Sequence, residues 1–96
     1  MTIQLDTIVA RNDTILFSDL DNRMMMMSID NGEYYSLDAV ASRIWTLLVN
    51  PLSVADMCVT LVAEYEVSLE MCQQDILAFM NEMSMLEIVK VLNQRQ

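Results

Sequence analysis

Few side chains in this 96-residue sequence are of the types that perform catalysis. There is no histidine, which excludes a histidine general base, a Ser-His-Asp or Cys-His nucleophile and an imidazole metal ligand. A single glycine cannot form the glycine-rich loops that hold nucleotide phosphates. Carboxylates are abundant, but no cluster of other polar side chains accompanies them. We therefore expect a protein that is not an enzyme, has no catalytic residues and carries no cofactor.

The thiols are Cys58 and Cys72. They do not form a C-x-x-C pair, and no third thiol or imidazole is present to complete a zinc site. Each falls on the apolar stripe of an expected helix. We therefore expect two reduced thiols that are buried as small apolar side chains.

Residues 19–22, Asp-Leu-Asp-Asn, resemble the beginning of a calcium-binding loop. Arg23 and Met24 then stand where such a loop needs Asp or Asn followed by Gly. The sequence therefore predicts a solvated turn at 19–22 and no metal site.

The charge balance narrows the possible partners. Fourteen acidic and five basic side chains give a net charge of −9. Phosphates of nucleic acids and anionic membrane surfaces repel such a chain. No apolar run approaches the length of a membrane-spanning helix, and residues 1–10 lack the basic segment of a secretory signal. We expect a cytoplasmic protein that binds neither nucleic acid nor membranes.

The length suits one domain, residues 1–96, with one core, and 54% of the residues are apolar. The first part of the chain carries strand signals, and residues 1–13 form either a loose arm or an extra strand. Asn31-Gly32 favours a type I′ hairpin turn, because both of its central residues need a positive φ. The expected strands, joined as an antiparallel meander, are Thr14–Ser18, Met24–Ile29 and Glu33–Leu37.

Three helices are expected to follow the strands. Asn50-Pro51 ends the first helix, and Ser53 and Ser68 are suitable N-caps for the second and third. Residues 87–92 either extend the third helix or form a short strand. The fold class is therefore α+β: a small winged-helix-turn-helix-like domain in which a three-stranded antiparallel sheet precedes three helices. Apolar residues recur with the helical period in residues 37–48, 54–65 and 69–86.

A helix-turn-helix beside a small sheet is a common DNA-binding arrangement. From Ile44 to Val89, however, there is no Lys or Arg, whereas seven carboxylates are present. A recognition helix of this composition would be repelled by phosphate. The shape is therefore expected without the DNA-binding function.

Two features suggest a surface for a peptide. The expected strand at 33–37 ends the meander, so its free edge could pair with an added strand. The four consecutive methionines at 24–27 give two side chains to each face, as core filler or as an adaptable contact surface. Which of Tyr34 and Tyr35 faces the peptide depends on strand register, which the sequence leaves open.

An ordered set of motifs resembles the PqqD-like family of RiPP recognition elements over about residues 14–92. The resemblance extends most closely to the stand-alone leader-binding proteins of lasso-peptide biosynthesis. Three positions differ from the family pattern: Asp38 replaces Asn, Met80 replaces Leu, and Glu87 lies near the usual Gly after the third helix. The motifs are Gly32-Glu-Tyr-Tyr-Ser-Leu-Asp38, Ala41-Ser-Arg-Ile-Trp-Thr-Leu-Leu48, Ser53-Val54, Leu61, Tyr65-Glu-Val67 and Asp75-Ile-Leu-Ala-Phe-Met80.

The resemblance implies that the chain binds the leader segment of a ribosomally made precursor peptide. The leader would add beside the third strand, lie against the third helix and be delivered to a leader peptidase or other modifying enzyme. Asp75 would accept a hydrogen bond or pair with a leader cation. We expect Phe79→Ala or Met83→Asp to weaken leader binding while the fold survives. The implied peptide-binding residues are Glu33, Tyr34, Tyr35, Ser36 and Leu37 on the strand, and Asp75, Ile76, Phe79, Met80 and Met83 on the helix.

Two alternatives remain open. The chain could resemble the pyrroloquinoline-quinone type of peptide chaperone, whose partner is a radical-SAM enzyme. It could also be a structural or assembly subunit in which the Met-rich surface and the free edge serve protein association, including a homodimer.

Overall fold

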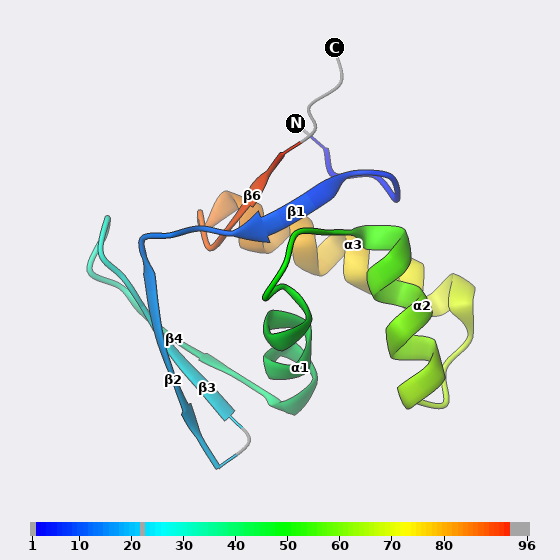
Figure 1. Cartoon of the computed structure of the whole chain (residues 1–96), viewed down its shortest axis with the longest axis horizontal. Helices are drawn as coiled ribbons and strands as arrows, with labels where there is room; N and C mark the ends of the chain where they lie inside the picture. Colours follow the sequence, from blue (N-terminus) through cyan, green and yellow to red (C-terminus); the bar gives the residue numbers. More distant parts are fainter. Residues whose placement is uncertain (1, 22, 93–96) are drawn as a thin grey trace.

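The computed structural model describes residues 2–21 and 23–92. It has a mixed α+β fold with two three-stranded antiparallel sheets and three helices (Figure 1). The predicted α+β class, with its antiparallel meander and three helices, is confirmed. The elements are β1 (Ile8–Arg11), β2 (Ile15–Leu20), β3 (Arg23–Ser28), β4 (Tyr34–Leu37), α1 (Ala39–Leu47), β5 (Leu52–Ser53), α2 (Val54–Glu64), α3 (Leu69–Met85) and β6 (Val89–Val91).

The first sheet is the predicted meander, in the order β2-β3-β4. Its central strand carries the four methionines, which alternate between the two faces. Met24 and Met26 are 6% and 1% exposed and point toward the helices. Met25 and Met27 lie on the opposite, outer face of the sheet. Two of the four methionines are therefore core residues.

The turn between β2 and β3 is shorter than predicted. Asp19 and Leu20 belong to β2, and Leu20 pairs with Arg23, so only positions 21 and 22 connect the strands. Asp21 has a φ of 52°, as tight hairpin turns require. Asn22, the last residue of the predicted turn, lies outside the described residues.

The β3–β4 hairpin forms, but the predicted type I′ turn is wrong. Gly32 has a φ of 71°, whereas Asn31 is not among the described residues with a positive φ. The Gly32 N–H donates to the Ser28 carbonyl at 2.8 Å, and the Ser28 N–H donates to the Glu33 carbonyl at 2.9 Å. The connection is thus a longer loop with glycine in the left-handed position, because Asn-Gly signals a hairpin without fixing its register.

A second sheet, in the order β5-β1-β6, joins segments from the beginning, middle and end of the described chain. β1 resolves the ambiguity of residues 1–13, since it is the additional strand rather than a loose arm. β6 likewise shows that the segment after the third helix forms a strand. β5 was not predicted, because a two-residue strand has no readable period.

The predicted caps are confirmed at two helices. The Ser53 hydroxyl accepts from the Asp56 N–H, and the Ser68 hydroxyl accepts from the Met71 N–H, each at 3.1 Å. The first helix begins at Ala39 rather than Leu37, because Asp38 is its cap.

α3 ends at a residue in the left-handed conformation. Glu87 has a φ of 60°, and its N–H donates to the Ser84 carbonyl at 3.0 Å. The Ile88 N–H donates to the Met83 carbonyl, also at 3.0 Å. These two bonds form a Schellman motif, which usually places glycine where this chain has Glu87. The helix therefore ends here despite the missing glycine, and the chain turns into β6.

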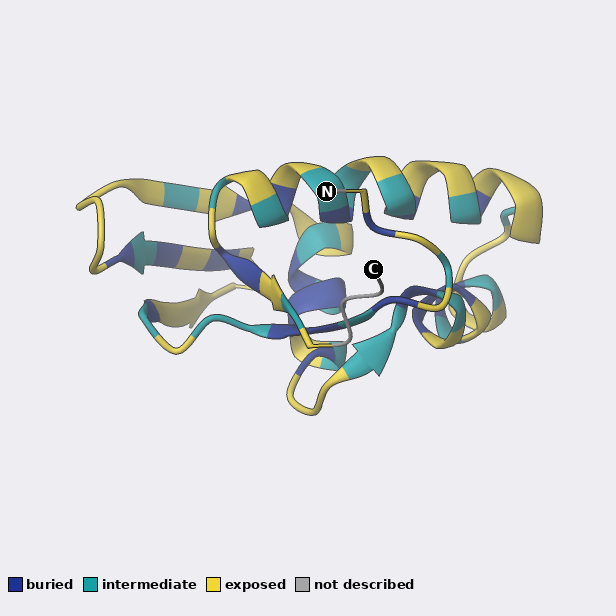
Figure 2. Ribbon diagram, turned by 90° about the horizontal axis from the view of Figure 1, so that it is seen from above, coloured by how far each residue is buried: buried dark blue, intermediate teal, exposed yellow. Residues whose placement is uncertain are grey.

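α1 packs against β3 and β4 of the first sheet, whereas α2 packs on α3 and β5, and the buried residues gather in the interior between these elements (Figures 1 and 2). Trp45 is 2% exposed and meets the edge of Phe17, with ring centroids 5.4 Å apart. The Arg11 guanidinium lies 4.8 Å from the Phe17 centroid and 4.6 Å from the Trp45 centroid. It also donates two hydrogen bonds to the Trp45 carbonyl, at 3.1 and 2.6 Å. Arg11 thereby ties β1 to both α1 and the first sheet.

Within the described residues, no helix combines the length and the apolar character needed to cross a membrane.

Candidate peptide-binding site

β4 forms one edge of the first sheet, and no other described strand pairs with its far side. The Ser28 N–H donates to the Glu33 carbonyl, so the backbone of Glu33 faces β3. In an antiparallel ladder these directions alternate, which turns the backbone of Tyr35 toward β3 and those of Tyr34 and Ser36 away from it. Tyr34 and Ser36 together leave two N–H and two C=O groups directed at this free edge.

The register also decides which way the two tyrosines face. Tyr35 lies opposite the buried Met26, and its half-buried side chain packs against the core. Tyr34 points to the outer face and is 70% exposed. Tyr35 is therefore the tyrosine on the side of the sheet that faces the helices.

α3 brings three of the predicted helix residues to one surface. Ile76 and Phe79 follow Asp75 by one and four positions, and this spacing places the three residues on one side of a helix. The Asp75 carboxylate is exposed, Phe79 is half-buried and Ile76 is 6% exposed. In Figure 2, β4 lies on the side of the molecule along which α3 runs.

A shallow cleft of about 190 Å³ separates this face of α3 from the beginning of α1. β4 leads directly into it, because the cleft begins at Asp38, the residue after the last one in the strand. Its floor is apolar, and its two charged residues are both acidic. The lining residues are Asp38, Val40, Ala41 and Ile44 from the α1 side, and Asp75, Ile76 and Phe79 from α3.

The residues from the α1 side were not predicted as site residues. The sequence pattern placed the groove between the third strand and the third helix, without the helix that follows the strand. A signal was present, because Val40, Ala41 and Ile44 have the spacing of one helix face. That spacing does not tell which neighbour the face meets.

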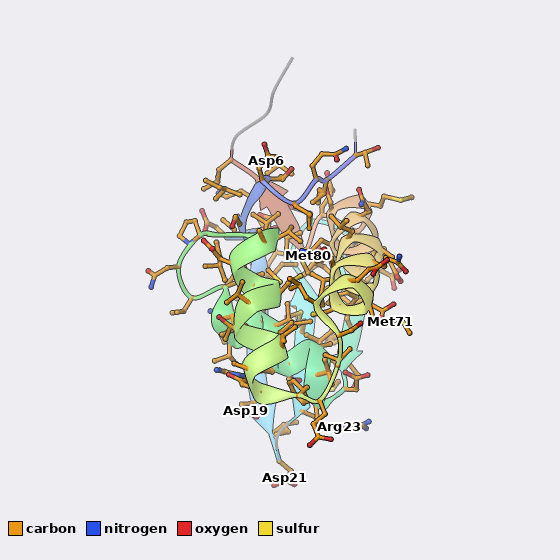
Figure 3. The ribbon with its side chains drawn as sticks, turned by 90° about the vertical axis from the view of Figure 1, so that its right-hand side faces the viewer. Asp6, Asp19, Asp21, Arg23, Met71 and Met80 are labelled. Carbon is orange, nitrogen blue, oxygen red and sulfur yellow. The ribbon has the colours of Figure 1, made fainter. Side chains whose placement is uncertain are left out.

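Of the five predicted helix residues, Met80 and Met83 do not line the cleft, and none of the predicted strand residues 33–37 lines it either. Met80 is fully buried, and Figure 3 shows it in the interior, whereas Met71 lies at the periphery. Met83 is 5% exposed and belongs to the same core cluster. Because the new carboxylate would be buried without a partner, the burial of Met83 replaces the earlier expectation: Met83→Asp is now expected to disrupt the fold.

A buried serine fixes the end of β4 against α1. The Met24 N–H donates to the Ser42 hydroxyl at 2.9 Å, and that hydroxyl donates to the Leu37 carbonyl at 3.3 Å. Met24 and Leu37 are paired across β3 and β4, so the serine side chain takes the place of a direct ladder bond. Ser42 thus sets the position of the strand edge relative to the cleft.

The described cations are placed away from the cleft. Arg43 and Glu64 form a bidentate pair at 2.8 and 2.6 Å, and the hydrogen bond from Arg43 lowers the pKa of the Glu64 carboxyl. Lys90 lies 3.7 Å from the Asp13 carboxylate. Asp38 uses one oxygen to cap α1, accepting from the Ala41 N–H at 2.8 Å.

The outer face of the first sheet is a second exposed surface. Leu16, Met27 and Tyr34 form one row across the three strands. Leu16 is 52% and Tyr34 70% exposed, and Met25 lies beside this row with 37% of its surface exposed. This apolar face is separate from the cleft, which lies on the helix side.

The two thiols are both buried, as predicted. Burial, together with the neighbouring Cys72 thiol, raises the pKa of Cys58 to about 12. A thiol with such a pKa is a poor nucleophile at neutral pH. Among residues 2–21 and 23–92, no group of three or more Cys, Asp or Glu side chains is arranged to hold a metal ion.

Comparisons with known proteins agree with this architecture. The family model described as coenzyme PQQ synthesis protein D (PqqD) matches residues 23–89. A solved structure described as TbiB1 in complex with the TbiA(beta) leader peptide is similar, with a TM-score of 0.82 and 25% sequence identity. The similarity covers 88% of this chain and 99% of that one. A search of curated proteins found no match. The chain belongs to the PqqD family, which confirms the resemblance inferred from its motifs.

Proposed function

We propose that this PqqD-family protein binds the leader segment of a ribosomally made precursor peptide and has no catalytic activity of its own. The leader adds as a strand to the free edge of β4, continues into the cleft against α3, and is delivered to the leader peptidase and cyclase of lasso-peptide biosynthesis in the cytoplasm.

The observation that carries this proposal is the continuity of an open strand edge with an apolar cleft. The backbone groups of Tyr34 and Ser36 face the free edge, and the strand then runs into the cleft at Asp38. Strand addition of this kind is a general mode of peptide recognition. The similar TbiB1 structure is itself a complex with a leader peptide.

The site divides affinity and specificity between two parts. Backbone hydrogen bonds along β4 hold any extended peptide, whereas side-chain pockets select the sequence. Ordering a disordered leader costs ~2–5 kcal/mol, so binding needs an apolar anchor beyond the backbone bonds. Tyr35, Ile76 and Phe79 are the residues we assign to that anchor. Asp75 adds an acceptor at the rim, and Met80 and Met83 support the floor from within the core.

The description of the matching family favours one alternative, a peptide chaperone in pyrroloquinoline-quinone synthesis. The two functions share the leader site and differ in the enzyme partner. A neighbouring gene for a radical-SAM enzyme would favour the chaperone, whereas one for a transglutaminase-like peptidase would favour lasso-peptide synthesis.

The exposed apolar outer face favours a second alternative, an assembly subunit or homodimer that binds no leader. Size-exclusion chromatography with and without a leader peptide separates this alternative from the proposal. Leader-independent self-association without a leader complex would favour the assembly subunit.

A matched pair of proline variants tests strand addition. Ser36→Pro removes an N–H that faces the free edge of β4 and leaves the ladder to β3 intact. Asp19→Pro makes the same change at the opposite edge. The Ile29 N–H donates to the Thr14 carbonyl, and alternation from that bond turns the Asp19 N–H away from β3. Both variants should therefore fold, which circular dichroism checks.

The leader peptide for this test is the N-terminal segment of the precursor encoded beside the gene, titrated by calorimetry. We expect Ser36→Pro to weaken binding by about tenfold or more, because a backbone bond is lost and the ring obstructs the edge. Asp19→Pro should bind like the wild-type protein. Equal affinities for all three folded proteins would refute strand addition at β4.

A further inference from the structure

We propose that the cleft between α1 and α3 receives a lysine or arginine side chain of the bound leader. This inference rests on the proposed function, since the leader must first lie along β4 for one of its side chains to reach the cleft. It adds the chemical class of the residue that the site selects.

The shape and polarity of the lining match a long cationic side chain. The floor consists of apolar surface from Val40 and Ile44 on one side and from Ile76 and Phe79 on the other. Carboxylates occur on both walls, Asp38 at the beginning of α1 and Asp75 on α3. Lysine and arginine bury an aliphatic stem against apolar surface and keep a charged head among polar groups.

The two carboxylates remain available to such a head group. Among the described residues, no side chain forms a hydrogen bond or ion pair with Asp75. One carboxylate oxygen of Asp38 accepts a hydrogen bond from the Ala41 N–H, and the second oxygen has no partner within the described chain. The positive end of α1 offsets part of the Asp38 charge, whereas Asp75 has no such counter-charge, so the cleft as a whole stays negative.

The remaining charges strengthen this preference. No Lys or Arg lines the cleft, and Arg43 is occupied by Glu64. Glu33 adds a further exposed carboxylate just before β4, and the whole chain carries a net charge of −9. An acidic leader residue would be repelled here. An apolar residue would cover the floor, as the aliphatic stem of a lysine or arginine also does, but would leave both exposed carboxylates without a cationic partner.

A selection experiment tests the inference even when the sequence of the leader is unknown. A phage-displayed library of random 12-residue peptides is selected in parallel on three forms of the full chain. These are the wild-type protein, the double variant Asp38→Asn/Asp75→Asn, and the control Asp56→Asn/Glu66→Gln, which removes the same charge from exposed positions outside the cleft. Asparagine caps helices as well as aspartate, so Asp38→Asn keeps the N-cap of α1.

We expect the wild-type and control proteins to enrich Lys or Arg at one fixed position of a common peptide motif. The double variant should enrich the same motif without the cation. An apolar or acidic residue at that position in the wild-type selection would overturn the cation inference and leave strand addition standing. If no peptide motif is enriched on any of the three proteins, both the inference and the proposed function fail.

A double-mutant cycle measures the interaction. The enriched peptide is compared with a copy in which its cation is replaced by norleucine, each titrated against wild-type protein and Asp75→Asn by fluorescence anisotropy. Either change alone should weaken binding about fivefold, and the two together little more than either one. Fully independent losses would refute direct pairing between Asp75 and the cation.

Discussion

The end of α3 gives a prediction that requires no ligand. Glu87 holds a φ of 60° at the position where a Schellman motif usually has glycine. A side chain in this conformation costs roughly 1–2 kcal/mol. Glycine removes that cost but loses roughly 0.5–1 kcal/mol through the greater freedom of the unfolded chain. The substitution also removes a carboxylate from the negative end of the helix, which should stabilise the protein by about 0.3–1 kcal/mol.

Together these effects predict that Glu87→Gly stabilises the protein by about 1 kcal/mol. For a chain of this size the midpoint of thermal unfolding, followed by circular dichroism, should rise by about 4–8 °C. Glu87→Gln separates the charge effect from the backbone effect, because it removes the carboxylate and keeps the side chain in the left-handed position.

Glu82→Gly is the matched control on the same helix. Glu82 is exposed and lies in the last turn of α3, where glycine should cost about 1 kcal/mol, offset only in part by the loss of the carboxylate from the negative end of the helix. The same substitution, five positions apart, should therefore shift the unfolding midpoint in opposite directions. A lower midpoint for Glu87→Gly than for the wild-type protein would refute the assignment of strain to Glu87.

Four further predictions concern the cleft and the buried core. Phe79→Ala should weaken leader binding in calorimetry and lower the free energy of unfolding by about 1–2 kcal/mol. Met83→Asp should lower the free energy of unfolding by at least about 3 kcal/mol, so that the protein unfolds. A folded Met83→Asp protein would contradict the burial of Met83. Ser42→Ala should lower the free energy of unfolding by about 1–3 kcal/mol in urea titration, because two buried backbone groups lose their partner, while the exposed control Ser36→Ala should change it by less than about 0.5 kcal/mol. The pKa of Cys58 is raised from 9.0 to about 12, so the protonated thiol favours folding below pH 9, and this contribution disappears as the pH rises toward 12. Urea titrations between pH 8 and 11 should show this loss in the wild-type protein and less of it in Cys58→Ala; equal slopes for both would refute the role of Cys58.

Several features of the site follow from local sequence alone. Short runs of apolar and β-branched residues, separated by turn residues, predicted the meander. Ser53 and Ser68 predicted where two helices begin, because a cap depends only on the three residues that follow it. The absence of histidine and the excess of carboxylates are independent of folding. The ordered motifs around Tyr35, Trp45 and Phe79 were sufficient to recognise the family.

Which residues line the cleft depends on contacts between segments that are distant in the chain. Sequence periodicity assigned Ile76, Phe79, Met80 and Met83 to one apolar stripe, but a stripe does not show which of its members the neighbouring elements cover. The core encloses Met80 and Met83, whereas Phe79 stays half-exposed beside the cleft.

The sequence by itself determined the order of the main elements, the negative charge and the family of this protein. Only the tertiary structure decided the second sheet, the orientation of Tyr34 and Tyr35, and the contribution of α1 to the cleft. The physical reason is the range of the interactions. Helical and strand periods arise between neighbours in the chain, whereas β1 meets Val89–Val91, and Asp38 shares a cleft with Asp75, only after folding brings them together.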